Sequence, residues 1–114
     1  MINLREYKKE DADRLIRLAN NKNVSKYLTP FFPFPYTKKD AHWWLETGRI
    51  LNDAINKVIE YNEEFVGGIG IKPQKGWKSH IAEIGYWIGE EYWGNGIATD
   101  ALKQMTKLAL STKK

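Results

Sequence analysis

The fold is decided by residues 82–99, AEIGYWIGEEYWGNGIAT. Residues 80–89 have the composition of a strand, on which alternate side chains point to opposite faces. Ala82, Ile84, Tyr86 and Ile88 would share one face, and Glu83, Gly85, Trp87 and Gly89 the other. A glycine-bearing turn follows, and Gly94 begins a predicted amphipathic helix with an apolar stripe from Ile97 to Ala109. The segment therefore predicts a strand, a turn and a helix in immediate succession.

This turn has the features of a phosphate-binding site. Backbone N–H groups at a helix N-terminus lack intrahelical partners and lie at the positive end of the helix dipole. Gly94 and Gly96 would let the backbone approach a ligand, and Thr99 adds a hydroxyl. A dinucleotide loop would need a third glycine where Thr99 stands, and a triphosphate loop would need Gly-Lys-Ser/Thr, so both are excluded.

Gly85 and Gly89 place no side chain on one face of the strand, so that a flexible ligand could lie against exposed backbone there. The alternative is that these glycines only accommodate a crossing helix or a β-bulge. Both interpretations stay open on the strand alone.

The rest of the chain predicts one α+β domain over residues 1–114, with layered helices and a mixed, mostly antiparallel sheet. Three consecutive strands on short connections favour antiparallel pairing. The expected order is strand, helix, helix, three strands, helix. The elements are a strand at Ile2–Tyr7, a helix at Ala12–Ala19 ended by Asn20–Asn23, an ordered loop at Thr29–Tyr36, a helix capped by Thr37 and running to about Leu51, hairpin strands Asn56–Tyr61 and Phe65–Lys72, a turn region Pro73–Ser79, the strand His80–Gly89, and the final helix from Gly94.

Composition narrows the functional classes. The chain has no cysteine, and its two histidines, His42 and His80, are isolated, so we expect no metal. Eighteen basic against fourteen acidic residues give a charge of +4, which fits a solvated surface or a modest attraction for polyanions. The sequence lacks an apolar run of membrane length and a signal-peptide layout, so we expect a cytoplasmic protein with no membrane and no nucleic-acid partner.

The turn also resembles that of a known family, the GCN5-related N-acetyltransferases (GNAT), in the branch of the ribosomal-protein alanine acetyltransferases. The family pattern Gln/Arg-x-x-Gly-x-Gly/Ala is matched by residues 91–96, with Glu91 departing from the first position. The branch commonly reads Tyr-Trp-Gly-x-Gly followed by Ala-Thr and an acidic residue, as residues 92–100 do. Residues 35–45 and the opening Leu4-Arg5 are similar to this branch as well.

The resemblance implies acetyl-CoA as co-substrate and the N-terminal two-thirds of the acyl-CoA N-acyltransferase fold. It assigns the pantetheine arm of the coenzyme to the strand and the pyrophosphate to the turn. Glu83 stands where some members have a catalytic base, and an exposed strand carboxylate without a role is the alternative. Arm-binding residues would be Trp87, Ile88 and Gly89, and pyrophosphate-binding residues Tyr92, Gly94, Gly96, Ile97, Ala98 and Thr99.

Aromatic residues gather where this branch builds its acceptor side, although ordinary core packing would also explain them. They are Phe31, Phe32, Phe34 and Tyr36, together with Trp43 and Trp44. The implied acceptor is a primary amine on a protein N-terminus, a polyamine or a small amino compound.

Family members continue beyond the final helix with further strands, whereas this sequence ends at Lys114. We therefore expect a C-terminally incomplete domain that forms a homo-oligomer, because an uncovered strand edge invites pairing. The alternative to an enzyme is a catalytically incomplete CoA-binding or assembly module, and turnover would separate the two. Nucleic-acid binding would need a strongly salt-dependent interaction.

Overall fold

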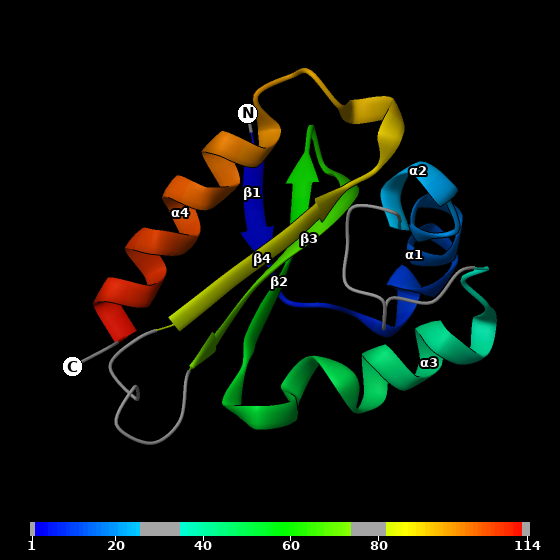
Figure 1. Cartoon of the computed structure of the whole chain (residues 1–114), viewed down its shortest axis with the longest axis horizontal. Helices are drawn as coiled ribbons and strands as arrows, with labels where there is room; N and C mark the ends of the chain where they lie inside the picture. The colour runs from blue at the N-terminus through cyan, green and yellow to red at the C-terminus, as the bar shows by residue number, and fades with distance from the viewer. Residues whose placement is uncertain (1, 26–34, 74–81, 113–114) are drawn as a thin grey trace.

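The structure is a computed structural model that describes residues 2–25, 35–73 and 82–112. Its elements follow the expected order, with short helical turns added between them (Figure 1). They are β1 (Ile2–Arg5), η1 (Lys9–Asp11), α1 (Ala12–Ala19), α2 (Lys22–Ser25), α3 (Lys38–Glu46), η2 (Gly48–Asp53), β2 (Ile55–Tyr61), β3 (Glu64–Pro73), β4 (Ala82–Ile88), η4 (Glu90–Tyr92) and α4 (Ile97–Thr112), where η denotes a 3-10 helix.

The described strands form one sheet in the order β1-β2-β3-β4, and every neighbouring pair is antiparallel. Tyr61 pairs with Glu64, so β2 and β3 are joined by the two residues Asn62 and Glu63. Both have positive φ, 51° and 69°, as a type I′ hairpin turn requires. The predicted hairpin and the α+β class are confirmed.

Helices cover both faces of this sheet, with α4 on one side and α1 and α3 on the other (Figure 1). Neighbouring strand residues divide between the two layers, as strand alternation requires. Ile59 and Val66 pack with Ile97 and Met105 of α4, whereas Val58 and Phe65 pack with α1 and α3. Strands β2 and β3 are therefore buried from both sides, and the N-terminus of α4 lies close to the end of β4.

Two predicted helix boundaries were wrong, and each lies next to a glycine. The helix capped by Thr37 ends at Glu46 rather than near Leu51, and the chain continues as η2. A Cβ at Gly48 would lie 2.5 Å from the Trp43 ring, so the chain turns tightly against that side chain. The final helix begins at Ile97 rather than at Gly94, because Gly94 and Gly96 have φ of 85° and 71°, outside the helical region.

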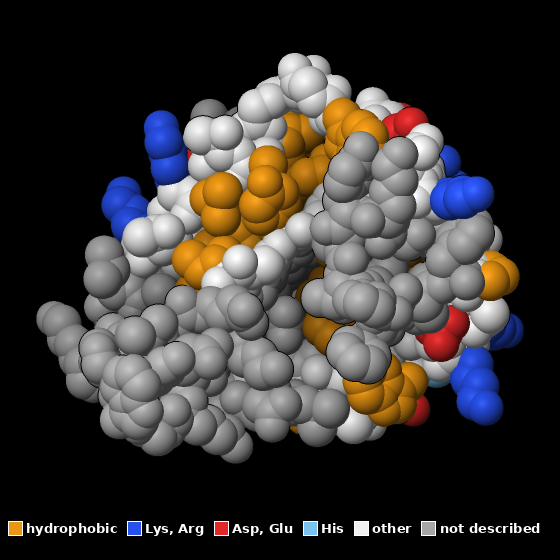
Figure 2. All heavy atoms as spheres, in the orientation of Figure 1, with side chains coloured by type: hydrophobic (Ala, Val, Ile, Leu, Met, Phe, Trp, Pro, Cys, Tyr) orange, Lys and Arg blue, Asp and Glu red, His pale blue; other side chains and the backbone are white. Residues whose placement is uncertain are grey.

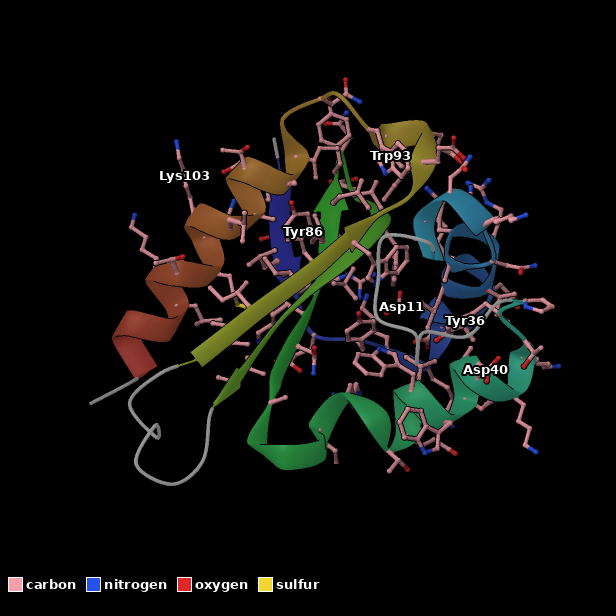
Figure 3. The ribbon with its side chains drawn as sticks, in the orientation of Figure 1. Asp11, Tyr36, Asp40, Tyr86, Trp93 and Lys103 are labelled. Carbon is pink, nitrogen blue, oxygen red and sulfur yellow. The ribbon has the colours of Figure 1, made fainter. Side chains whose placement is uncertain are left out.

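The predicted start of α3 is confirmed by a reciprocal cap. Thr37 Oγ1 accepts from Asp40 N at 3.2 Å, and Thr37 N donates to Asp40 Oδ2 at 2.9 Å. Such a capping box satisfies two backbone donors at the helix start. It fixes where α3 leaves the segment that contains Tyr36 (Figure 3).

A partly buried charge cluster joins β1, η1 and β2. The Arg5 guanidinium donates to both carboxylate oxygens of Asp11, at 2.8 and 3.0 Å, and to Glu60. Asp11 is buried with a relative exposure of 6% and also accepts from Lys8 N. The hydrogen bond from Arg5 holds the pKa of Glu60 below its usual value.

No helix in the described part of the chain has the length and apolar character needed to cross a bilayer. Within the same residues, no three His, Cys, Asp or Glu side chains gather as a metal ion would need.

Candidate functional site

A cavity of about 610 Å³ lies where the edge of β4 meets the N-terminus of α4. Its walls come from β4, from the turn, from the first residues of α4 and from Val24 of α2, and the turn contributes Tyr92, Trp93, Gly94 and Gly96. Figure 2 shows hydrophobic side chains gathered in a hollow on this face, alongside α4. No Asp, Glu, Lys or Arg belongs to the described lining, so an anion would meet backbone groups and not charged side chains.

The turn presents a row of backbone donors to this cavity. The first hydrogen bond of α4 runs from Asp100 N to Gly96 O at 3.2 Å. The N–H groups of Ile97, Ala98 and Thr99 precede it and so have no intrahelical acceptor. They lie at the positive end of a helix of 16 residues and belong to cavity-lining residues. This arrangement is suited to binding a phosphate group.

Hydrogen bonds hold the turn in its conformation before any ligand arrives. The indole of Trp93 donates from Nε1 to Ile88 O at 2.7 Å, and Asn95 Nδ2 donates to Tyr92 O at 3.1 Å. Backbone bonds from Tyr92 N to Gly89 O and from Trp93 N to Glu90 O complete the 3-10 turn η4. The donors of the turn are therefore preorganised, which lowers the entropic cost of binding.

Tyr92 is also fixed from the opposite layer. Its hydroxyl accepts from Arg14 of α1, whose guanidinium lies 5.8 Å from the Tyr92 ring centroid. Arg14 Nε donates to Phe65 O at 2.9 Å, so the guanidinium is itself anchored to β3. A contact between helix α1 and the sheet therefore sets one wall of the cavity.

The outer edge of β4 carries backbone groups that β3 does not use. Gly89 N donates to Val66 O at 2.8 Å, which continues the β3–β4 register and marks a hydrogen-bonded pair. Antiparallel pairs alternate between hydrogen-bonded and non-hydrogen-bonded. The N–H and C=O groups of Ile84, Tyr86 and Ile88 therefore point away from β3, and the Trp93 indole already occupies Ile88 O.

The structure brings together every residue that the sequence assigned to the coenzyme except Gly89. Trp87 and Ile88 of β4 and the six residues of the turn all line the cavity. Gly89 lies just outside it, where an added Cβ would come within 2.9 Å of Leu18. The backbone groups of Trp87 and Gly89 face β3, so the ligand-facing backbone of this strand belongs to Tyr86 and Ile88.

The proposed acceptor and catalytic residues are less well defined. Glu83 pairs with Lys72 in the β3–β4 ladder, and its side chain lies outside the described part of the structure. Phe31, Phe32 and Phe34 also lie outside the described residues. Tyr36 is buried in the core beside α1 and α3, where burial raises the pKa of its hydroxyl.

Trp44 and Trp43 lie in different surroundings. Trp44 packs edge-on against Tyr7 with 5.9 Å between ring centroids, which is core packing. Trp43 is exposed, at 53%.

Several cavity residues were absent from the sequence-based assignment. Tyr86 of β4 and Trp93 of the turn are aromatic residues with relative exposures of 43% and 44% (Figure 3). The sequence showed that each of them is next to a glycine and that Tyr86 belongs to an alternating strand pattern, but it did not show that their side chains are exposed. Val24 had no sequence signal, because it belongs to a helix of only four residues whose first two, Lys22 and Asn23, were interpreted as part of the segment that ends α1.

Comparisons with known proteins identify related sequences and structures. The family model described as Acetyltransferase (GNAT) domain matches residues 2–114. The "Uncharacterized N-acetyltransferase p20" of Bacillus licheniformis is 27% identical over 117 residues, which covers 91% of this chain and 60% of that protein. The crystal structure of a "Probable acetyltransferase" has 28% sequence identity and a TM-score of 0.73. The match covers 97% of this chain and 64% of that protein.

A third similar structure is RimL, a ribosomal L7/L12 alpha-N-protein acetyltransferase in complex with coenzyme A. It has a TM-score of 0.79 at 19% sequence identity, and the match covers 95% of this chain and 63% of RimL. The antiparallel sheet with helices on both faces matches the acyl-CoA N-acyltransferase fold of these similar structures. The chain belongs to the GNAT acetyltransferase family. It spans less than two thirds of the length of these relatives.

Proposed function

We propose that this chain binds acetyl-CoA in the cavity between β4 and α4 and supplies the coenzyme site of an N-acetyltransferase that acetylates a primary amine. Family membership supports acetyl transfer as the class of reaction. RimL, whose structure has a similar fold, was solved in complex with coenzyme A. The acceptor is a protein N-terminus, a polyamine or a small amino compound.

One observation carries this proposal. A single cavity includes both the outward-facing backbone of Tyr86 and Ile88 and the unpaired donors of Ile97, Ala98 and Thr99. An extended amide-bearing arm needs a strand edge, and a pyrophosphate needs a cluster of N–H donors. Coenzyme A contains both groups in one molecule, so a ligand of this kind uses the whole cavity.

The residues present fit such a ligand. An added Cβ at Gly85, Gly94 or Gly96 would meet no atom within 4 Å, so there is open space beside the strand and above the turn. The apolar lining suits a flexible arm, and the turn needs no charged side chain to hold phosphate.

Acetyl-CoA supplies an acetyl group activated as a thioester. The chain must hold this ligand, and the amine must lose a proton before it can attack. Glu83 is our candidate for the base that takes this proton, because it belongs to β4 on the same face as Gly85 and Trp87. The aromatic residues Phe31, Phe32, Phe34 and Tyr36 are candidates for the acceptor side.

The alternative is a module that binds acetyl-CoA without turnover. It deserves testing because the chain spans only 60% to 64% of the length of its relatives. Calorimetric titration with acetyl-CoA tests the site, and release of free thiol in the presence of an amine panel tests the activity. Binding with thiol release supports the enzyme, binding alone supports the module, and no binding refutes both.

Homo-oligomerisation and a cytoplasmic location stay predictions. Ile84 and Tyr86 expose apolar surface beside the open edge of β4, at 38% and 43%. Sedimentation at micromolar concentration, with and without acetyl-CoA, tests whether a second copy covers this edge. A monomer under both conditions would refute the predicted oligomer.

A further inference from the structure

The four-residue helix α2 contacts the cavity and the neighbouring turn at the same time. Val24 has a relative exposure of 3% and lines the cavity. It belongs to neither of the hydrophobic clusters that pack on the two faces of the sheet. A helix of four residues has no stability of its own in water. The contacts that hold α2 therefore decide where Val24 lies.

Asn21 performs two tasks with one side chain. Its Oδ1 accepts from the backbone N–H groups of Asn23, at 2.8 Å, and Val24, at 3.3 Å, which caps the start of α2. Its Nδ2 donates at 2.9 Å to Glu90 Oε1 on η4. The same amide therefore shapes α2 and ties it to the segment that leads into the turn.

Glu90 accepts a second hydrogen bond from α2. Asn23 Nδ2 donates to Glu90 Oε2 at 3.0 Å, so each carboxylate oxygen receives one amide. Glu90 begins η4, and Tyr92 at the end of η4 lines the cavity. The three residues Asn21, Asn23 and Glu90 thus link two separate walls of the cavity, and we call them the amide latch.

We propose that the amide latch is a positioning device for coenzyme binding, in which Glu90 holds α2 so that Val24 closes the cavity beside the turn. This inference rests on the proposed function of the cavity. If the latch and the ligand stabilise the same arrangement, each must strengthen the other by the same factor. Acetyl-CoA should therefore slow hydrogen exchange in α2, and loss of the latch should weaken acetyl-CoA binding.

The chain offers substitutions that separate the latch from the cap. Asn21→Asp keeps an oxygen that caps α2 but places a carboxylate against Glu90. Glu90→Gln removes the charge and retains one of the two acceptors. The double variant restores both hydrogen bonds, because the glutamine amide donates to the new aspartate and its oxygen accepts from Asn23. Glu6→Gln is the matched control, since Glu6 is an exposed carboxylate whose ion pairs are with Arg49 of η2 and Lys57 of β2 and not with α2 or the turn.

The experiment measures the acetyl-CoA dissociation constant by calorimetry and α2 amide exchange by mass spectrometry for all five proteins. We expect Asn21→Asp to weaken binding about three- to tenfold, and the double variant to return within about twofold of the original chain. Glu6→Gln should leave binding unchanged. In the ligand-free chain, Asn21→Asp should already speed exchange at Val24.

The outcomes separate the latch from the cavity assignment. If the unmodified chain fails to bind acetyl-CoA, the proposed function is wrong. If it binds and Asn21→Asp binds equally well, the latch is wrong. Equal weakening in Asn21→Asp and in the double variant also overturns it, because Asn21 would then act independently of Glu90.

Discussion

Replacing Gly96 by valine should separate the turn's phosphate-binding role from its structural role. Gly96 has φ of 71°, and the N–H groups of Ile97 and Ala98 follow it directly. A β-branched residue in this left-handed region costs about 1–2 kcal/mol. An added Cβ meets no atom within 4 Å, so this conformational cost is the only stability penalty that the structure indicates.

The effect on binding should be larger than the effect on stability. A valine at Gly96 relieves its strain by rotating the turn, which misaligns one or two donors to a charged phosphate. Each such hydrogen bond contributes about 1.5–3 kcal/mol. We therefore expect acetyl-CoA affinity to fall by about 2–3 kcal/mol, or roughly 30- to 150-fold, while the midpoint of thermal unfolding falls by only several degrees.

The assay is calorimetric titration of acetyl-CoA into the original chain, Gly96→Val and Gly96→Asn. Asparagine tolerates a left-handed backbone, so Gly96→Asn should keep the conformation of the turn and lose little affinity. An unchanged dissociation constant for Gly96→Val would refute the assignment of phosphate to this turn. Equal losses in both variants would show that side-chain bulk, and not backbone conformation, controls binding.

Three further predictions concern catalysis, preorganisation and pH. Glu83→Gln should lower turnover roughly a hundredfold or more and leave acetyl-CoA affinity nearly unchanged, and equal turnover would remove Glu83 as the base. Trp93→Phe removes the 2.7 Å hydrogen bond to Ile88 O and should weaken acetyl-CoA binding about two- to tenfold by calorimetry; unaltered binding would contradict a positioning role. The lowered pKa of Glu60 stabilises the fold above the ordinary glutamate value of about 4.3, and this contribution is lost as pH falls through the folded-state pKa. Urea unfolding should therefore show Glu60→Gln less stable than the original chain at pH 7 and equally stable at low pH, and a constant difference would contradict the ion pair with Arg5.

The sequence predicted the elements of this fold better than their ends. The strand–turn–helix unit and the hairpin at Asn62 and Glu63 were both visible, because runs of strand-forming residues and the spacing of apolar residues indicate which elements form. The start of α4 was placed three residues too early, since a glycine's φ sign cannot be read from its identity. Gly94 could have begun the helix, and in the structure it lies in the left-handed region.

The sequence predicted the part of the site that a local backbone motif forms. It did not predict the part that depends on contacts between elements far apart in the chain. The turn residues follow from a local motif, so sequence reasoning found them. The outward direction of Tyr86 depends on its register with β3, which no local pattern fixes. Val24 and the amide latch depend on contacts between α2 and η4, which are more than 60 residues apart, as the separation of 69 between Asn21 and Glu90 shows.

Amide NMR with acetyl-CoA tests the central claim most directly, because it reads each backbone donor of the cavity separately. On addition of the ligand, the amide resonances of Tyr86 and of Ile97, Ala98 and Thr99 should shift. The Gly89 amide, which already donates to Val66 O, should keep its slow hydrogen exchange. Ligand-induced shifts confined to other parts of the chain, with the α4 N-terminus unaffected, would contradict the assignment of this cavity to acetyl-CoA.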